Sequence, residues 1–204
     1  MKKLFLSSSF CDIADLFMEF VSEDLRGKSV TFIPTASVVE EVDFYVSDAI
    51  EKFKSLGMDI DEIDISKASK NEIETKIKQN DFIYISGGNS FFLLQELKVK
   101  EIDKLLIEEI NRGKFYIGES AGAIILYPNI EYIKDMDDCK KAPFLDNYDA
   151  LNVTPFYSLP HYKEFPFEDT TDNIYNEYKN KLKLYPFSNS EAILVKANEI
   201  KLLK

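Results

Sequence analysis

One stretch, Lys114-Phe-Tyr-Ile-Gly-Glu-Ser-Ala-Gly-Ala-Ile-Ile-Leu126, constrains the fold more than any other part of this chain. Its first apolar residues, 115–117, form a run typical of a buried parallel strand. A glycine-bounded turn, 118–122, follows at once, and 123–126 read as the first turns of a helix. The stretch therefore predicts a strand, a sharp turn and a helix, with Ser120 at the apex of the turn.

The spacing around Ser120 suits a nucleophile for a steric reason. A serine in a strained turn at the end of a central strand stands clear of the sheet, and the flanking Gly118 and Gly122 let strand and helix approach without a Cβ clash. The amide of Ala121 would then point from the helix N-terminus and hold an oxyanion. The alternative is a tight turn that merely contains a serine, and glycine patterns of this length are common.

The remainder of the first 126 residues alternates between predicted strands and predicted helices. The strands are expected at 4–6, 30–33, 60–65 and 82–85, and the helices at 13–21 (ending before Gly27), 42–56, around 73–77, 91–97 and 102–110. This alternation predicts a parallel sheet covered on both faces. Active sites of such sheets lie beyond the carboxyl ends of the strands, where both Gly87-Gly88 and Ser120 fall.

The regular pattern weakens after residue 126. Residues 127–149 form a long, acidic and mostly irregular segment, which favours a functional or mobile loop. A short strand is expected at 151–154, a helix at 174–184, and a closing hairpin from 192–195 and 200–203 around Ala197-Asn198. No repeat or linker interrupts the chain, so we expect a single domain over residues 1–204.

Composition excludes several classes of function. The net charge is −11 and the basic residues are scattered among acidic ones, so we expect no nucleic-acid or membrane partner. No run of 18 apolar residues is present, and the apolar start reaches Ser7 too soon for a signal-peptide core. Cys11 and Cys139 are far apart and in no metal-binding spacing, which favours reduced thiols in a cytoplasmic protein.

The chain has a single histidine, His161, in a proline-bounded segment. A serine is a poor nucleophile without a base, so a hydrolase using Ser120 would have to recruit His161. The alternative for His161 is a surface or packed residue without a role in chemistry. Gly88 likewise has two interpretations: a second oxyanion amide, or part of a turn in which Asn89 caps the next helix. A phosphate loop is not indicated, because the Walker lysine is missing.

Four segments together carry a family resemblance. They are Ile85-Ser-Gly-Gly-Asn-Ser-Phe-Phe-Leu-Leu94, Tyr116-Ile-Gly-Glu-Ser-Ala-Gly-Ala123, Tyr148-Asp-Ala-Leu-Asn152 and Leu159-Pro-His161. Their order and spacing resemble peptidase family S51. The resemblance implies a three-layer α/β fold with a mostly parallel sheet, flavodoxin-like and related to class I glutamine amidotransferases. It also implies a serine peptidase with a Ser-His-acid triad that hydrolyses small peptides as a dipeptidase, after an N-terminal aspartate in the best-known members, without metal or cofactor.

The resemblance assigns roles to residues of this chain position by position. Ser120 matches the nucleophile, His161 the base, and Gly88 and Ala121 the oxyanion amides. The candidate substrate-binding residues are Asn89, Glu119 and Asp135, the last of which falls where the family has an aspartate in its loop.

Two departures from the family pattern affect these expectations. The family places an acid before the last hairpin, and gap-free alignment puts Asn189 there, with Glu191 two residues further on. We favour Glu191 as the residue that orients His161, because a charge-assisted partner is stronger than a neutral one. Glu119 stands where aspartyl dipeptidases have tryptophan, which leaves a preference for N-terminal aspartate open.

Two other functions remain compatible with the sequence. One is a catalytically weak or inactive binding module on the same fold, its triad weakened at Asn189. The other is a general serine esterase using Ser120, His161 and Asp146 or Asp149, although the chain is short for that fold and lacks its His-Gly-Gly-Gly sequence. For the peptidase, the expected partner is a small peptide, and the expected state is a monomer or homodimer.

Overall fold

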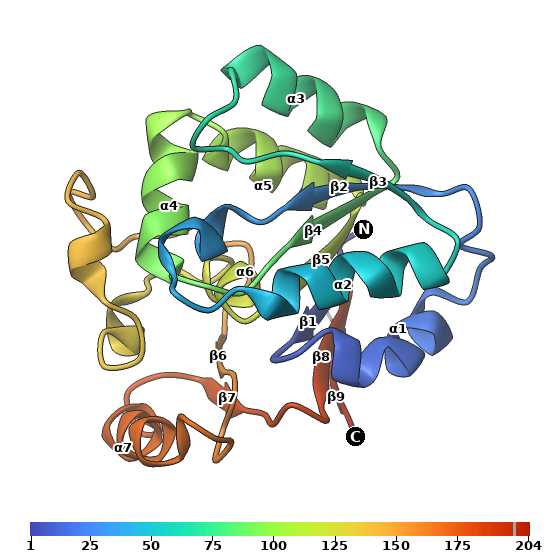
Figure 1. Ribbon diagram of the computed structural model, residues 1–204. Coiled ribbons are helices and arrows are strands. Elements are labelled where there is room, and N and C mark those ends of the chain that lie inside the picture. Colours follow the sequence, from blue (N-terminus) through green and yellow to red (C-terminus); the bar gives the residue numbers. More distant parts are fainter. Residues whose placement is uncertain (198) are drawn as a thin grey trace.

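The computed structural model of the protein describes residues 1–197 and 199–204, and its centre is a seven-stranded sheet. The strand order is β3-β2-β4-β5-β1-β8-β9 (Figure 1). The strands are β1 (Lys3–Ser7), β2 (Ser29–Ile33), β3 (Asp59–Glu62), β4 (Phe82–Ile85), β5 (Phe115–Glu119), β8 (Ala192–Lys196) and β9 (Glu199–Leu203). The strand that precedes Ser120 is thus the central strand of the sheet.

Strands β1 to β5 run parallel, and the closing hairpin extends the sheet beyond β1, with β8 antiparallel to both β1 and β9. The carboxyl ends of the parallel strands therefore meet at one edge of the sheet. The expected α/β fold, with a mostly parallel sheet between two layers of helices, is confirmed. The hairpin is also confirmed, while Asn198 of its expected turn lies outside the described residues.

Alternating side chains of the strands enter two separate apolar layers. In β1, Leu4 and Leu6 face one layer and Phe5 the other, because successive residues of a strand point to opposite faces. The helices are α1 (Ala14–Val21) and α2 (Phe44–Ser55) on the Phe5 face, and α3 (Lys70–Gln79), α4 (Ser90–Val99) and α5 (Asp103–Arg112) on the other. Figure 1 shows α1 and α2 side by side on their face of the sheet.

Two adjustments to the expected helices have local causes. The first helix ends at Val21, well before Gly27, because Ser22 adopts the left-handed conformation (φ 56°) and its amide donates to the Met18 carbonyl. The helix after 167, α7 (Glu168–Tyr178), begins earlier than expected at 174 and ends earlier than 184. The apolar spacing had located its buried stripe around Ile174 but not its acidic first turn.

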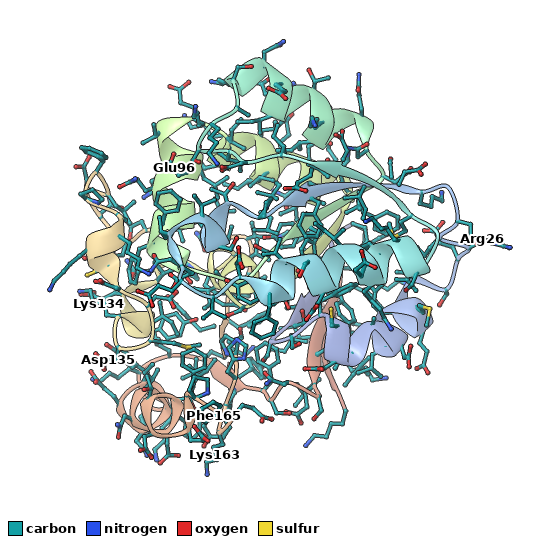
Figure 2. The ribbon with its side chains drawn as sticks, in the orientation of Figure 1. Arg26, Glu96, Lys134, Asp135, Lys163 and Phe165 are labelled. Atoms are coloured by element: carbon teal, nitrogen blue, oxygen red, sulfur yellow. The ribbon has the colours of Figure 1, made fainter. Side chains whose placement is uncertain are left out.

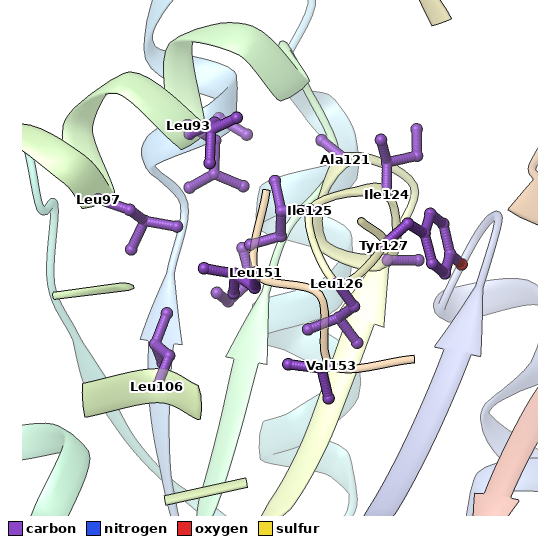
Figure 3. Packing of buried hydrophobic residues seen from close by; sticks show 14 of the residues in the cluster. Leu93, Leu97, Leu106, Ala121, Ile124, Ile125, Leu126, Tyr127, Leu151 and Val153 are labelled. Carbon is purple, nitrogen blue, oxygen red and sulfur yellow. The ribbon is translucent and has the colours of Figure 1, made fainter. Parts of the chain in front are cut away.

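A second, two-stranded parallel sheet pairs β6 (Tyr157–Leu159) with β7 (Leu184–Pro186), and α7 connects them (Figure 1). The strand expected at 151–154 is wrong: these residues are irregular, and the amides of Leu151 and Val153 donate to the carbonyls of Ile125 and Leu126. Figure 3 shows Leu151 and Val153 packed beside residues from α4 and from the segment after β5. Burial under the sheet explains their apolar character without a strand.

The segment 127–149 is irregular, as expected, and contains short 3₁₀ turns at Glu131–Ile133 and Cys139–Lys141. Further 3₁₀ turns, at Cys11–Ile13 and Thr35–Val39, follow β1 and β2. Among the described residues, no helix is both long enough and apolar enough to cross a membrane.

Candidate active site

Ser120 occupies a strained turn between β5 and the short helix α6 (Ala121–Ile124). Its backbone has φ 46° and ψ −104°, a combination that costs a non-glycine residue about 1–3 kcal/mol. Neighbouring hydrogen bonds hold it there: its amide donates to the Ser7 carbonyl at 2.8 Å, and its own carbonyl accepts from the amides of Ala123 and Ile124 at 2.9 and 3.0 Å. The sheet and the helix together therefore fix the serine at the carboxyl end of the central strand.

The flanking glycines are required by close backbone approach. A Cβ on Gly118 would lie 2.7 Å from the carbonyl oxygen of Gly122, and a Cβ on Gly122 would lie 2.2 Å from that of Ile85. Real Cβ atoms do not come so close to backbone, so both positions exclude a side chain. The expected steric role of the two glycines is confirmed.

His161 and Asn189 are brought together by the β6–β7 pair. His161 follows β6 and Asn189 follows β7, so the two residues stand beyond the carboxyl ends of adjacent parallel strands. The ladder continues past the strands: the Phe187 amide donates to the Leu159 carbonyl and the Tyr162 amide to the Phe187 carbonyl, each at 3.1 Å. This small sheet carries both residues to the edge where Ser120 stands.

Ser120, His161 and Asn189 form a continuous line of polar contacts. Ser120 Oγ lies 3.0 Å from His161 Nε2, and Asn189 Oδ1 lies 2.8 Å from His161 Nδ1. When the amide oxygen accepts from Nδ1–H, the neutral imidazole presents a lone pair at Nε2 to the serine hydroxyl. Burial lowers the pKa of His161 and so favours the neutral ring, while the Asn189 hydrogen bond and the charge of Glu164 act in the opposite direction.

The preference for Glu191 as the partner of His161 is wrong in this structure. The Glu191 carboxylate accepts from the Ser188 amide at 3.0 Å and lies 3.1 Å from Lys204 Nζ. The turn from 188 to 191 is closed by the Glu191 amide, which donates to the Ser188 carbonyl. This turn directs Glu191 towards the C-terminal strand and leaves Asn189 at the imidazole.

Ser8, a residue that no sequence motif marks as functional, anchors the His161 segment. Its hydroxyl accepts from the His161 amide at 3.0 Å and donates to the Phe187 carbonyl at 3.3 Å. Ser8 directly follows β1, at the edge of the sheet where sites of this fold class lie. The position of Ser8 after a strand could have marked it as a candidate site residue. Its neighbours along the chain, however, do not indicate that it binds the His161 segment, about 150 residues away.

The loop after β4 lies against Ser120. A Cβ on Gly87 would be 3.4 Å from Ser120 Cβ, and one on Gly88, which has φ 126°, would be 2.3 Å from the Ala36 carbonyl group. Only glycine therefore fits at position 88. In the described part of the chain, the amides of Gly88 and Ala121 donate to no other backbone group.

Two of the three candidate substrate-binding residues, Asn89 and Glu119, make hydrogen bonds within the protein, and the third, Asp135, is exposed. Asn89 caps α4 through its Oδ1, which accepts from the Phe92 amide at 2.9 Å, and its Nδ2 donates to the Asp138 carbonyl. This is the helix-cap interpretation of the glycine-rich turn. Asp135 is exposed on the surface of the 127–149 segment (Figure 2).

Glu119, the third candidate, is buried beneath the site. Its carboxylate accepts from the Phe10 amide at 2.9 Å and from the Tyr84 hydroxyl. Burial raises the pKa of Glu119, while these hydrogen bonds oppose the rise. The residue ties β5 to β4 and to the segment after β1, which stabilises the strands on both sides of the serine.

Asp137, two residues after the candidate Asp135, is the acid that reaches the α4 N-terminus. It accepts from the Ser90 amide at 2.9 Å, and burial raises its pKa to about 6. Within residues 1–197 and 199–204, no group of three or more His, Cys, Asp and Glu side chains is arranged to hold a metal ion.

Comparison with known proteins identifies the family. The model of peptidase family S51 matches residues 4–203. The chain is 56% identical over 200 residues to an uncharacterized peptidase of Listeria monocytogenes, Lmo0363, covering 98% of this chain and 97% of that one. It is 35% identical over 134 residues to Peptidase E of Shewanella sp. ANA-3, covering 66% of this chain and 53% of that one. A crystal structure from Listeria monocytogenes EGD-e, provisionally assigned to Peptidase E, superposes with a TM-score of 0.96 at 55% identity and covers 100% of this chain and 98% of that one.

Proposed function

Because this chain belongs to peptidase family S51 and is therefore a peptidase, we propose that it hydrolyses small peptides by a serine mechanism. Ser120 is the nucleophile, His161 the general base, and Asn189 the residue that orients the imidazole. The observation that carries the proposal is the unbroken line of contacts from Asn189 Oδ1 through the two ring nitrogens of His161 to Ser120 Oγ.

The geometry supports two steps of acyl transfer. In the first, Ser120 Oγ attacks the scissile carbonyl carbon while His161 Nε2 takes the hydroxyl proton, and the amides of Gly88 and Ala121 hold the oxyanion. The imidazolium then passes that proton to the leaving amine as the C–N bond breaks. In the second step, water attacks the acyl-enzyme with His161 again as base, and Ser120 regains its proton as the acid product leaves.

Asn189 sets the expected speed of this reaction. Its amide oxygen selects the correct tautomer of His161, which is the larger part of what the third residue of a triad supplies. It is neutral, so it stabilises the imidazolium formed during attack less than a carboxylate would. We therefore expect a working but slow peptidase.

Dipeptide-sized molecules are the proposed substrates, and N-terminal aspartate is one specificity to test. Glu119 does not provide a cationic group for an aspartate side chain, and it is engaged with Phe10 and Tyr84. The net charge of −11 also disfavours an acidic substrate. A panel of dipeptides with acidic, neutral and basic N-terminal residues therefore belongs in the first assay.

A non-catalytic binding module is the second candidate, because a neutral Asn189 replaces the acid expected in a triad. No hydrogen bond or ion pair of the described residues joins either candidate acid of the esterase alternative, Asp146 or Asp149, to His161, and Asp149 accepts instead from Asn129 Nδ2. The two cysteines are free thiols, which supports a cytoplasmic setting for either candidate.

Labelling with a fluorophosphonate probe separates the peptidase from the binding module. The native chain should be labelled, and Ser120→Ala and His161→Ala should not, while all three keep the same circular dichroism spectrum. The dipeptide panel, run beside it, should show hydrolysis only by the native chain. Hydrolysis by Ser120→Ala would refute the serine mechanism, and an unlabelled, inactive native chain would favour the binding module.

A further inference from the structure

The turn that follows His161 brings an acidic side chain back towards the site. The Glu164 amide donates to the His161 carbonyl at 3.0 Å, and the Phe167 amide donates to the Glu164 carbonyl at 2.7 Å. The Phe167 ring lies 5.3 Å from the imidazole, centroid to centroid. The chain between 161 and 167 is thus folded on itself beside the imidazole, with Glu164 half-buried inside the fold.

Glu164 reaches the residue that orients the histidine. Its Oε1 accepts a long hydrogen bond, 3.4 Å, from the backbone amide of Asn189. Asn189 therefore contacts Glu164 through its main chain and His161 through its side chain. In a Ser-His-acid triad the carboxylate contacts the histidine directly. Here Asn189 makes that contact, and Glu164 contacts Asn189.

We propose that Glu164 is a positioning residue of this site, whose carboxylate holds the Asn189 backbone and supplies the negative charge that the Asn189 side chain lacks. The proposal rests on the proposed serine mechanism for its catalytic meaning. Glu164 and His161 are both partly buried, so solvent and salt screen the attraction between the carboxylate and the imidazolium less than they would at the surface.

The other charged groups around His161 are engaged elsewhere. Lys163, the neighbouring cation, lies 3.7 Å from Asp172, and Glu191 beyond Asn189 pairs with Lys204. On the Ser120 side, Glu119 accepts from backbone and tyrosine donors beneath the sheet edge. Burial lowers the pKa of His161, and the Asn189 hydrogen bond and the Glu164 charge both act to raise it.

The single histidine of this chain makes the test direct, because one imidazole signal in a proton NMR titration belongs to His161 alone. Glu164→Gln removes the charge and keeps an oxygen that can accept from the Asn189 amide. We expect His161 to titrate at a lower pH in this variant than in the native chain. We also expect kcat to fall by about tenfold, with KM unchanged, because the lost charge acts only when the imidazolium forms.

Two further variants control the interpretation. Glu191→Gln makes the same change of charge two residues from Asn189, and it should leave both the His161 titration and kcat at native values. Glu164→Asp keeps the charge, so its titration midpoint should lie between those of Glu164→Gln and the native chain.

An unchanged His161 titration in Glu164→Gln, or equal shifts in Glu164→Gln and Glu191→Gln, would overturn the inference. The titration needs no substrate, so it decides the matter even if the native chain proves inactive. Inactivity would count against the proposed function, whereas an unmoved titration would count against Glu164.

Discussion

Replacing Asn189 by aspartate tests the proposed triad most directly. Asn189→Asp keeps the shape of the side chain and exchanges a neutral acceptor, 2.8 Å from His161 Nδ1, for a charged one. A neutral hydrogen bond contributes about 0.5–1.5 kcal/mol and one to a charged group about 1.5–3 kcal/mol. The difference of about 1–1.5 kcal/mol favours the imidazolium, and it corresponds to a rise in kcat of about five- to tenfold.

The structure also limits this gain. Glu164 already accepts from the Asn189 amide, so a new carboxylate at 189 would repel it, and the tenfold figure is an upper bound. Restoring a carboxylate should not return the roughly 10⁴-fold that its loss can cost, because that loss comes mainly from the wrong imidazole tautomer. Here the asparagine oxygen already selects the correct one.

The assay is the pH dependence of kcat and of kcat/KM for the best dipeptide of the panel, with Asn189→Ala as the control that removes the hydrogen bond. A carboxylate raises the pKa of an adjacent imidazole, so the acid limb of the Asn189→Asp profile should lie at higher pH than that of the native chain. A plateau kcat at or below the native value, together with an unmoved acid limb, would refute the role given to Asn189.

The remaining predictions concern the base, the serine turn and the buried acid. Since burial lowers the pKa of His161 below its usual value of 6.5, kcat/KM should rise with pH as the imidazole loses its proton, with a midpoint below 6.5. A midpoint above 6.5 would contradict this. Gly122→Ala places a Cβ 2.2 Å from a β4 carbonyl oxygen and should lower the free energy of unfolding by more than about 3 kcal/mol. The control Gly27→Ala, whose Cβ would have nothing within 4 Å, should lower it by about 1 kcal/mol. Equal losses of unfolding free energy in urea would argue against the clash. Glu119→Ala leaves the buried Phe10 amide and the Tyr84 hydroxyl without their acceptor, and it should lower the free energy of unfolding by about 2–4 kcal/mol. An unfolding midpoint equal to that of the native chain would show that the carboxylate is not needed for stability.

The sequence by itself determined the parts of this protein that depend on neighbours along the chain. The serine turn could be predicted because the clash that excludes a side chain at Gly118 arises within one strand, turn and helix, whereas the clash at Gly122 involves the Ile85 carbonyl of β4. The sheet could be predicted because strand and helix periods are local properties, while the division of Leu4 and Leu6 from Phe5 between two layers was seen only in the structure. His161 could be selected because no other histidine competes with it.

Only the tertiary structure decided which side chain contacts His161 Nδ1. The contact of His161 with Asn189 spans 28 residues and depends on the register of β6 and β7, strands too short to be located with certainty from their sequence. The choice between Asn189 and Glu191 depends on one turn, which directs the glutamate towards Lys204. A charge preference argued from the sequence favoured the carboxylate, but backbone geometry placed the amide at the imidazole, because a side chain can act only where the fold directs it.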